Sequence, residues 1–264
     1  MKLSIIGSGN MGGAIARGLC KSDFAKSLEI CCADKSEDIL NNIAADYKCI
    51  MTTKDNRKAV EGADIIIIAV KPWLVESVFS EIKDSLDYGR QIIVSIAAGV
   101  EFEKLLMYLK KSGQTADPAL FRIIPNTAIE VRESVNFVSA INASQEQIDL
   151  IMRLFGELGL TLLVEERLIR SGTALASCGI AYAFRYIRAN IEGAVEIGLY
   201  PEQAKKIMIQ TLRGAITLLE HNNSHPEVEI DRVTTPGGIT IKGLNVMEAA
   251  GFTQSVIKGL KASM

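Results

Sequence analysis

Glycines near the start of the chain are the residues whose spacing most clearly predicts a chemical role. In residues 5–13, IIGSGNMGG, an apolar run leads into Gly7, Gly9 and Gly12. In a dinucleotide-binding turn the first glycine permits the tight turn, the second admits the pyrophosphate, and the third lets helix and strand pack closely. Backbone N–H groups at the start of the following helix then hold the phosphate charge. The residues of this turn predicted to bind the cofactor are Gly7, Ser8, Gly9, Asn10, Met11 and Gly12. A purely structural glycine turn is the alternative.

An acidic residue follows this turn at the spacing that the same motif requires. Asp34 ends the second apolar run, about twenty residues beyond the glycines, where an acid accepts hydrogen bonds from a ribose hydroxyl. An acid there favours NADH, because it repels a 2′-phosphate. Lys35 and Ser36 follow directly and could contact such a phosphate, so both NADPH and NADH stay open. In the alternative, Asp34 is the N-cap of the helix predicted over SEDILNNIA.

A second glycine-rich stretch lies near the other end of the chain, in TTPGGITIKGL at residues 234–244. Pro236-Gly237-Gly238 is incompatible with a helix, whereas the residues that follow can form one. A glycine loop that opens a helix is an anion site, here sized for a carboxylate. Hydroxyls of Thr235 and Thr240 could reach that carboxylate or a substrate heteroatom. A capped turn between two helices is the alternative.

The elements that must position these loops differ between the two parts of the chain. Short β-branched runs alternate with helical patterns in the first part, and several runs are apolar throughout, as strands covered on both faces are. The predicted strands are residues 2–7, 28–34, 49–53, 63–70, 91–99, 121–125, 135–140 and 160–166. This alternation predicts an α/β fold with a doubly wound, mostly parallel sheet over residues 1–164. Ligands of such sheets bind at the carboxyl ends of the strands, which here carry AVKP (69–72), SIAAG (95–99) and IPNT (124–127).

Residues 165–264 are predicted to form an all-helical domain. Two long helical patterns follow one another, with Gly198 and Pro201 as the C-terminal and N-terminal signals between them. Both patterns are apolar around much of their circumference. Because one hundred residues form a bundle too thin to bury such helices, a second copy of the chain is expected to cover them.

Composition excludes several classes of partner. The 264 residues carry a formal charge of −2 with no basic run, so no nucleic-acid partner is expected. The longest aliphatic run is too short to cross a bilayer, so no membrane partner is expected either. The cysteines are five in number and lack CxxC spacing, which favours a reduced, cytoplasmic protein without a signal peptide. No metal site is predicted.

Taken in order, IIGSGNMGGAI, AVKP, SIAAGV, IPNT and VTTPGGITIKGL resemble the pyrroline-5-carboxylate reductase family, from residue 2 to about residue 258. The resemblance implies a Rossmann-type domain followed by a helical dimerisation domain, with homodimers often gathered into larger rings. It implies that the carboxylate loop and the cofactor at one site come from different subunits. The further cofactor-binding residues implied are Asn56, Ala69, Val70, Lys71, Pro72 and the stretch from Ser95 to Ala97, and Asp34 and Lys35 join them by their position after the second predicted strand. The substrate-binding residues implied are Val233, Thr234, Thr235, Gly237, Gly238, Ile239 and Thr240, of which Thr240 is catalytic and faces the ring nitrogen.

Departures from the family pattern cluster near the implied substrate. The family usually has SGSGPAY where this chain has ASCGIAY (176–182), and MPNTP where it has IPNTA. Ile239 stands where a small residue or threonine is common, and Arg232 where asparagine is common. These changes bear on substrate identity or catalytic efficiency more than on the fold.

The predicted function is reduction of the cyclic imine 1-pyrroline-5-carboxylate to L-proline, the last step of proline biosynthesis, with hydride from NADPH or NADH. Such an imine needs alignment and one donor more than a placed acid or base. His221 and His225 flank NNS in a predicted loop and are not expected to act. The alternatives are a β-hydroxyacid dehydrogenase-like enzyme or another imine reductase, for which Lys242 ahead of Asn245 is a weak signal, and a non-catalytic nucleotide-binding homologue.

Overall fold

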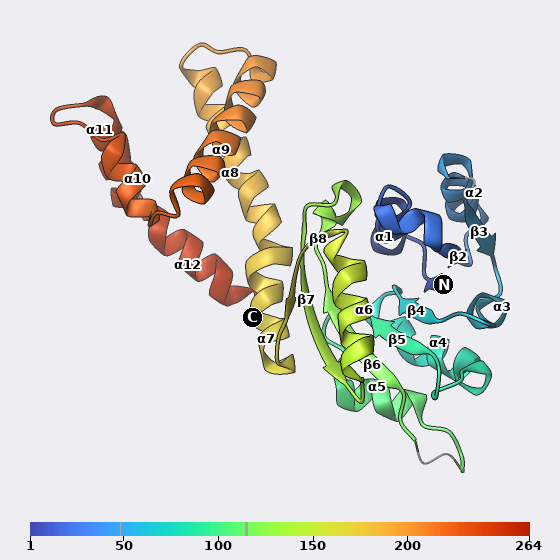
Figure 1. Ribbon diagram of the computed structural model, residues 1–264. Helices are drawn as coiled ribbons and strands as arrows, with labels where there is room; N and C mark the ends of the chain where they lie inside the picture. The colour runs from blue at the N-terminus through green and yellow to red at the C-terminus, as the bar shows by residue number, and fades with distance from the viewer. Residues whose placement is uncertain (48, 114–115) are drawn as a thin grey trace. The chain divides into compact units, whose positions relative to one another are not determined.

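The protein divides into two compact units in the computed structural model, which describes residues 1–47, 49–113 and 116–264 (Figure 1). The first unit is Met1–Ser177 and the second is Cys178–Met264. Each is described by itself below. The domain boundary predicted after residue 164 falls just beyond the last strand of the first unit, and it stays a prediction.

The first unit is built on one eight-stranded sheet with the order β3-β2-β1-β4-β5-β6-β7-β8. The strands are β1 (Lys2–Ile6), β2 (Glu29–Ala33), β3 (Ile50–Thr53), β4 (Ile65–Ile68), β5 (Ile92–Ser95), β6 (Ala119–Ile124), β7 (Ser134–Ile141) and β8 (Gly159–Leu163). All neighbours are parallel except β6 and β7, which are antiparallel. The eight predicted strands and the doubly wound, mostly parallel sheet are therefore confirmed.

Helices cover both faces of this sheet, which explains why the central strands are apolar throughout. All four isoleucines of β4 are fully buried, two on each face. One face packs against α1 (Asn10–Cys20), α2 (Glu37–Asp46) and α6 (Gln145–Gly156), and the other against α3 (Asn56–Val60), α4 (Val75–Ile82) and α5 (Phe102–Leu109). Figure 1 shows α1 and α4 on opposite sides of the strands. The remaining short helices are η1 (Asp23–Ser27), η2 (Pro72–Leu74), η3 (Lys83–Ser85), η4 (Thr127–Val131), α7 (Glu166–Gly172) and the π-helix η5 (Thr173–Cys178), whose last residue is the first of the second unit.

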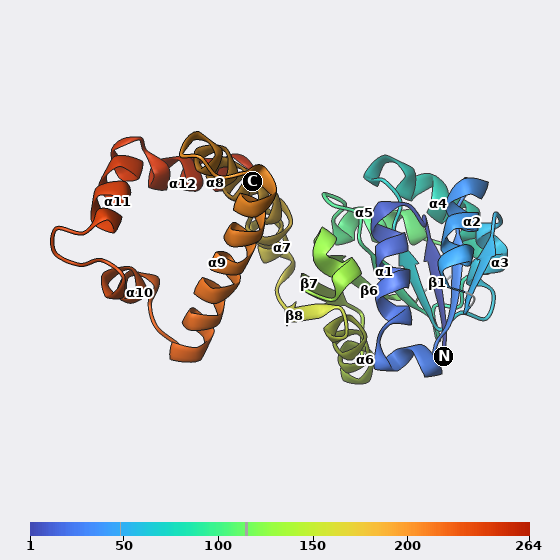
Figure 2. The same ribbon diagram turned by 90° about the horizontal axis from the view of Figure 1, so that it is seen from above.

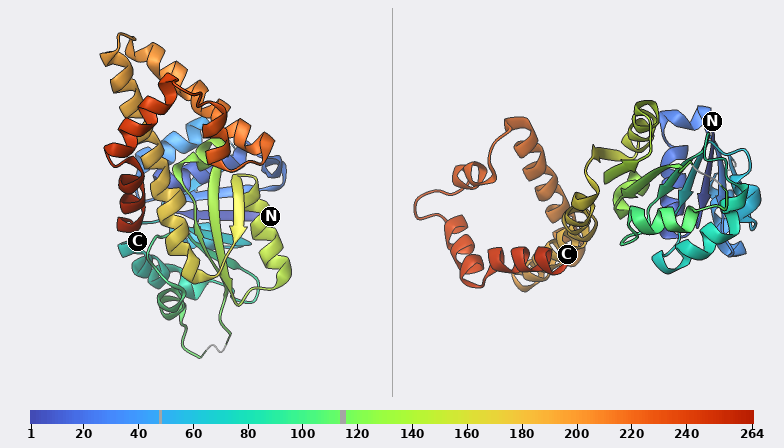
Figure 3. Two further views of the ribbon diagram at one scale, coloured as in Figure 1. Left: turned by 90° about the vertical axis from the view of Figure 1, so that its left-hand side faces the viewer. Right: turned by 90° about the horizontal axis from the view of Figure 1, so that it is seen from below.

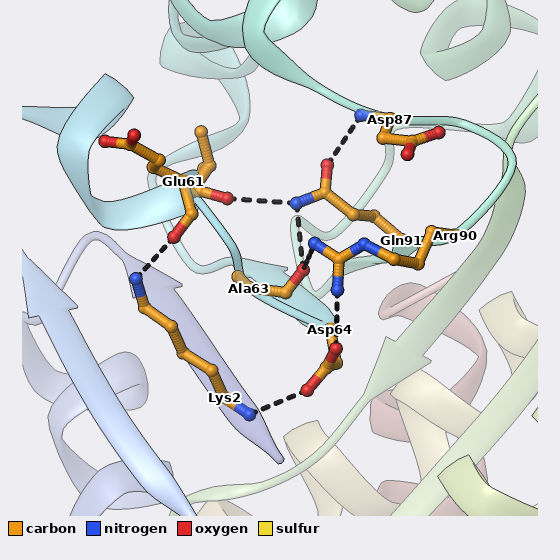
Figure 4. A network of polar contacts seen from close by, with 8 residues as sticks. Lys2, Glu61, Ala63, Asp64, Asp87, Arg90 and Gln91 are labelled. Atoms are coloured by element: carbon orange, nitrogen blue, oxygen red, sulfur yellow. Dashed lines mark hydrogen bonds and ion pairs between the residues drawn. The ribbon is translucent and has the colours of Figure 1, made fainter.

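Polar side chains hold the amino-terminal edge of the sheet together (Figure 4). The Asp64 carboxylate accepts from the backbone N–H of Lys2 at 2.8 Å and from Nη1 of Arg90 at 2.7 Å. The buried Gln91 amide donates to the carbonyls of Val60 and Ala63, each at 2.9 Å. These bonds join the chain around β1, β4 and β5 at one edge. The carboxyl edge, where the glycine turn lies, is left to bind ligands.

The second unit consists of helices alone: α8 (Gly179–Glu196), α9 (Pro201–Asn222), α10 (Pro226–Arg232), α11 (Ile239–Ala249) and α12 (Phe252–Ala262). Helices α8 and α9 pack side by side, and α9 to α12 follow one another round an open loop of helices (Figures 2 and 3). As expected, Gly198 adopts a positive φ of 101° after α8, and Pro201 is the first residue of α9. The Rossmann-type unit followed by a helical unit is thus confirmed.

Little of the second unit is buried within it. Among its described residues, Ala204 is the one hydrophobic side chain classed as buried, at 3% exposure. Large apolar side chains face outward, with Ile239 86% and Ile197 82% exposed. None of the helices in the described ranges combines the length and hydropathy needed to span a membrane. The exposed apolar surface therefore needs another cover.

Candidate active site

The glycine turn connects β1 to α1 in the first unit, and each of its three glycines has a different environment. Gly7 has a φ of 88°, and a Cβ there would lie 2.7 Å from Cγ1 of Val70. A Cβ on Gly12 would lie 2.0 Å from the carbonyl oxygen of Gly7, so only glycine lets α1 start this close to the turn. A Cβ on Gly9 would meet no heavy atom within 4 Å. Gly9 therefore faces open space, where a ligand can approach the backbone.

The start of α1 is prepared to bind an anion. Its N-cap, Gly9, provides no side-chain acceptor, and the first turn holds no acidic residue. The unpaired N–H groups and the positive end of the helix dipole therefore point toward whatever occupies the space beside Gly9. A phosphate is the ligand that such a helix terminus favours.

Asp34 follows β2 and lies against the glycine turn. One carboxylate oxygen accepts from the N–H of Ser8 at 2.8 Å, and the other accepts from the N–H of Ser36 at 2.9 Å. The N-cap of α2 is Ser36, so the alternative in which Asp34 caps this helix is wrong. The acid instead closes a short turn of its own and ties the glycine turn to the end of β2.

A cavity of about 620 Å³ opens at the carboxyl edge of the sheet, a volume within the usual range for ligand sites. It lies at the switch point where β1 and β4 are neighbours and the strand order reverses. Of the residues predicted to bind the cofactor, those that line this cavity are Gly7, Gly9, Asn10, Met11, Asp34, Ala69, Val70, Lys71, Pro72 and Ala97.

The other five residues predicted to bind the cofactor do not line the cavity. Ser8 and Gly12 are buried within the turn beneath it. Ser95 is also buried, and its hydroxyl accepts from the N–H of Ala97 at 3.4 Å. Lys35 is exposed beside Asp34. The Asn56 side chain donates to Oε2 of Glu81 at 2.9 Å, so a cofactor contact from this amide requires a change of partner.

Several cavity residues were not predicted from the sequence. These are Leu74, Thr173 and Ser177, whereas the lining residues Ile96, Ala98, Ile124 and Pro125 belong to the strand ends SIAAG and IPNT that the sequence indicated. Thr173 and Ser177 belong to the π-helix Thr173–Cys178, a rare form that often marks functional sites. The Ser177 hydroxyl donates to the carbonyl of Pro125 at 2.8 Å, which fastens this helix to the end of β6. Small residues in SGTALASCG were the one signal that could have indicated this close packing.

The second glycine loop lies in the second unit and opens a helix, as predicted. Gly237 has a φ of 74°, Gly238 is the N-cap of α11, and no side chain caps this helix. A Cβ on Gly238 would lie 2.6 Å from Oγ1 and 3.0 Å from the carbonyl oxygen of Thr235, so a larger residue there would force Thr235 to shift. Thr240 is exposed in the first turn of α11. The loop thus presents uncapped N–H groups and a hydroxyl at one helix start, a suitable arrangement for a carboxylate.

A carboxylate supports this loop from the preceding helix. One oxygen of Glu229 accepts from the Ser224 hydroxyl, from the Asn222 amide at 3.0 Å and from Nη1 of Arg232 at 2.6 Å. The bonds from Ser224 and Asn222 hold the pKa of Glu229 below its usual value, with a smaller effect from Arg232. Arg232, unusual by the family pattern, therefore fixes the end of α10 directly before the loop.

Histidines do not provide a placed acid or base in the described part of the chain. His221 lies in the last turn of α9, so its prediction as a loop residue was wrong. His225 is the N-cap of α10, and its Nδ1 accepts from the N–H of Glu227 at 3.3 Å. The described residues hold no cluster of three or more His, Cys, Asp or Glu side chains arranged for a metal ion.

Two family models match two separate stretches of this chain. One, described as NADP oxidoreductase, coenzyme F420-dependent, matches residues 2–99, and one described as pyrroline-5-carboxylate reductase dimerisation matches residues 166–264. The first match covers the glycine turn, and the second covers the whole helical unit.

Full-length relatives agree with these matches. Pyrroline-5-carboxylate reductase 1 of Dictyostelium discoideum is 36% identical over 99% of this chain, which spans about half (48%) of that relative's length. Pyrroline-5-carboxylate reductase 2 of the same organism is 34% identical over 99% of this chain and 90% of its own length. The crystal structure of Plasmodium falciparum pyrroline carboxylate reductase with NADP bound is similar in fold. It has a TM-score of 0.88 and 24% identity, and the match covers 100% of this chain and 95% of that one.

Proposed function

Because this chain belongs to the pyrroline-5-carboxylate reductase family, we propose that it reduces 1-pyrroline-5-carboxylate to L-proline with hydride from NAD(P)H. It is an oxidoreductase that acts on a carbon–nitrogen double bond. The observation that carries the proposal is the cavity at the β1/β4 switch point, beside a helix start that favours a phosphate.

The residues around the glycine turn fit a dinucleotide. Gly9 leaves space that a Cβ would occupy, and the start of α1 presents N–H groups without an acidic neighbour in its first turn. In the proposal these groups hold the pyrophosphate, and Ala69, Val70 and Ala97 form the apolar wall beside the reacting ring. The bound cofactor supplies the hydride. The protein supplies alignment and excludes water from the reacting atoms.

The loop between α10 and α11 is proposed to hold the substrate. The N–H of Gly238 donates to the carbonyl of Thr235 at 2.9 Å, so the uncapped N–H groups of α11 that begin at Ile239 would receive the ring carboxylate at the positive end of this helix. The hydroxyl of Thr240 would then donate to the ring nitrogen, where charge develops as the imine is reduced. Val233, Thr234, Thr235, Gly238 and Ile239 shape the loop in this proposal.

A homodimer is proposed as the working form, with assembly into a larger ring as a further step. The dimerisation family match over the helical unit and the exposed apolar side chains on its helices support this. A cytoplasmic location is proposed as well, because the five cysteines are free thiols, as a reducing compartment maintains them.

Steady-state assays of the purified protein test the reaction. We expect loss of the NADPH or NADH absorbance on addition of 1-pyrroline-5-carboxylate and the appearance of proline. No oxidation of a 3-hydroxy acid with NADP⁺ is expected, which separates this function from a β-hydroxyacid dehydrogenase. Binding of the nucleotide without turnover of either substrate would instead indicate a non-catalytic homologue.

A further inference from the structure

Two cysteine side chains meet at the amino-terminal edge of the sheet, away from the cavity. Cys20 is the last residue of α1, and Cys49 lies in the turn directly before β3. Their Sγ atoms are 3.3 Å apart, although the two residues are 29 positions apart in the sequence. A disulfide has an S–S distance of about 2.05 Å, so an approach of roughly 1.3 Å would join them.

We propose that Cys20 and Cys49 form a reversible redox site that exchanges with small-molecule disulfides such as glutathione disulfide. The Cys49 thiolate attacks one sulfur of glutathione disulfide, forms a mixed disulfide and releases one glutathione thiolate. Cys20 then loses its proton and attacks Sγ of Cys49, which releases the second glutathione. The two protein thiols are oxidised by two electrons, one glutathione disulfide is reduced to two thiols, and the two protons pass to them.

Exposure decides the order of the two steps. Cys49 is exposed, so a dissolved disulfide can reach its sulfur, whereas Cys20 is only partly exposed. Burial and the hydrogen bond with Cys49 raise the pKa of Cys20 to about 12. Cys20 is thus the slower, resolving thiol, and its reaction accelerates as the pH rises. The nearby Cys32 is fully buried in β2, so a dissolved disulfide cannot reach its sulfur.

The position of the pair predicts what the bond does. Cys20 ends the helix whose other end is the glycine turn, and neither Cys20 nor Cys49 lines the cavity. The bond would close a loop that contains β2 and α2. Closing such a loop restricts the unfolded chain, so we expect a rise in Tm of roughly 5–10 °C on oxidation. The redox site is a stabilising staple and leaves the nucleotide edge unchanged.

Titration of the full-length protein with glutathione and glutathione disulfide tests the proposal. After oxidation and alkylation of the free thiols, mass spectrometry is expected to find one disulfide-linked pair of peptides, which carry Cys20 and Cys49. Thermal unfolding of the same oxidised sample is expected to give the higher Tm. Dithiothreitol should reverse both. Cys178→Ser, which removes the partly exposed cysteine of the second unit, is the matched control and should behave as the wild type.

Single variants distinguish the roles of the two thiols. Cys20→Ser should stop at a stable mixed disulfide on Cys49, and Cys49→Ser should leave Cys20 free. Persistent glutathione on Cys49 in the wild type, or two thiols that stay free under oxidising buffer, would overturn the proposal. The readouts are thiol state and Tm, so they are independent of catalytic activity.

Discussion

The two units of this protein bury their side chains very differently. In Met1–Ser177, helices cover both faces of the sheet, and Phe79, Phe121 and Phe155 are completely buried. In Cys178–Met264, Ala204 is the one hydrophobic residue classed as buried among those described. The first unit completes its own core, whereas the second leaves an apolar surface exposed, which the proposed dimer would cover. Stability of the second unit should therefore depend on protein concentration, and that of the first should not.

The candidate ligand sites of the two units, the glycine turn and the loop after α10, also differ in how they are held in place. Backbone packing fixes the glycine turn, because a Cβ on Gly12 would collide with the turn itself. The loop after α10 instead follows a short helix that hydrogen bonds around Glu229 tie to the end of α9. We infer that nucleotide binding is preformed in the first unit, while substrate binding in the second is sensitive to local changes.

Removal of the Thr240 hydroxyl should cause the largest loss of activity. It tests whether the loop of the second unit contributes to the reaction itself. A donor at the site of developing charge matters more in the transition state than in ground-state binding. Thr240→Ala should lower kcat by roughly ten- to a thousandfold with little change in KM. Steady-state kinetics with saturating nucleotide measure this.

Gly238→Ala is the matched contrast for that variant. Its Cβ would lie 2.6 Å from Oγ1 and 3.0 Å from the carbonyl oxygen of Thr235, so Thr235 must shift while the Thr240 hydroxyl remains. KM should rise more than kcat falls. Full turnover in Thr240→Ala would mean that the hydroxyl is structural and that water or another residue supplies the proton.

A charge placed on each unit tests whether only the second is covered by another chain. Ile207 is 54% exposed and lines an apolar groove between helices of the second unit. Ile207→Asp should weaken self-association on the order of a hundredfold, because an unpaired carboxylate would be buried at the interface. Light scattering over a dilution series measures the mass.

Met107→Asp provides the matched control for Ile207→Asp. Met107 is 62% exposed on α5 of the first unit, so the same change there should leave the mass unaltered. A wild-type protein that is monomeric at micromolar concentration would contradict the proposed dimer, and with it the contrast between the two units.

Substitutions in the glycine turn test whether the first unit is preformed. Gly9→Ala should leave the fold intact and weaken nucleotide binding by about tenfold, since the new Cβ enters the space beside the helix start. Gly12→Ala should instead lower Tm. Trp73, the single tryptophan, lies between the cavity residues Pro72 and Leu74, so its fluorescence can report titrations. Unchanged affinity in Gly9→Ala would remove this turn from the site.

Substitution of Asp34 should change the preference between NADPH and NADH, with a smaller effect than the glycine substitutions have on affinity. Asp34→Asn keeps an oxygen for the N–H of Ser8 but removes the charge that repels a 2′-phosphate. The ratio of kcat/KM for NADPH over NADH should rise about fivefold. Asp38→Asn, on the exposed start of α2, is the control and should not change the ratio. A wild type that already prefers NADPH strongly would show that this charge does not face the ribose.

The smallest expected effect concerns the acid stability of the second unit. Hydrogen bonds from Ser224 and Asn222 depress the pKa of Glu229 in the folded state. This stabilisation is therefore complete above the unfolded pKa and is lost as the pH falls through the folded pKa. Glu229→Gln should lower Tm at neutral pH and flatten the fall in Tm on acidification. Glu227→Gln on the same helix is the control. If Tm fell with decreasing pH by the same amount in Glu229→Gln and Glu227→Gln, the supporting role of Glu229 would be contradicted.

Local patterns were sufficient to predict most elements of the fold. Apolar β-branched runs such as DIIIIAV predicted the strands, and all eight are present. Helix signals were equally local: Pro201 starts α9, and Gly238 precedes α11. His221 was placed in a loop because its neighbours are polar, yet α9 continues through it to Asn222. Hydrophobic period and turn chemistry act over a few residues, so the sequence displays them directly.

Some features of the candidate site follow from local sequence motifs, and others follow only from the tertiary structure. The glycine turns and the strand ends belong to motifs contained in short stretches, and the sequence by itself determined them. Tertiary structure alone decided that Asn56 donates to Glu81, that Ser177 fastens to Pro125, and that Cys20 meets Cys49. It also left the helices of the second unit exposed. Each of these contacts joins residues far apart in the chain, and such contacts depend on packing geometry that no local pattern encodes.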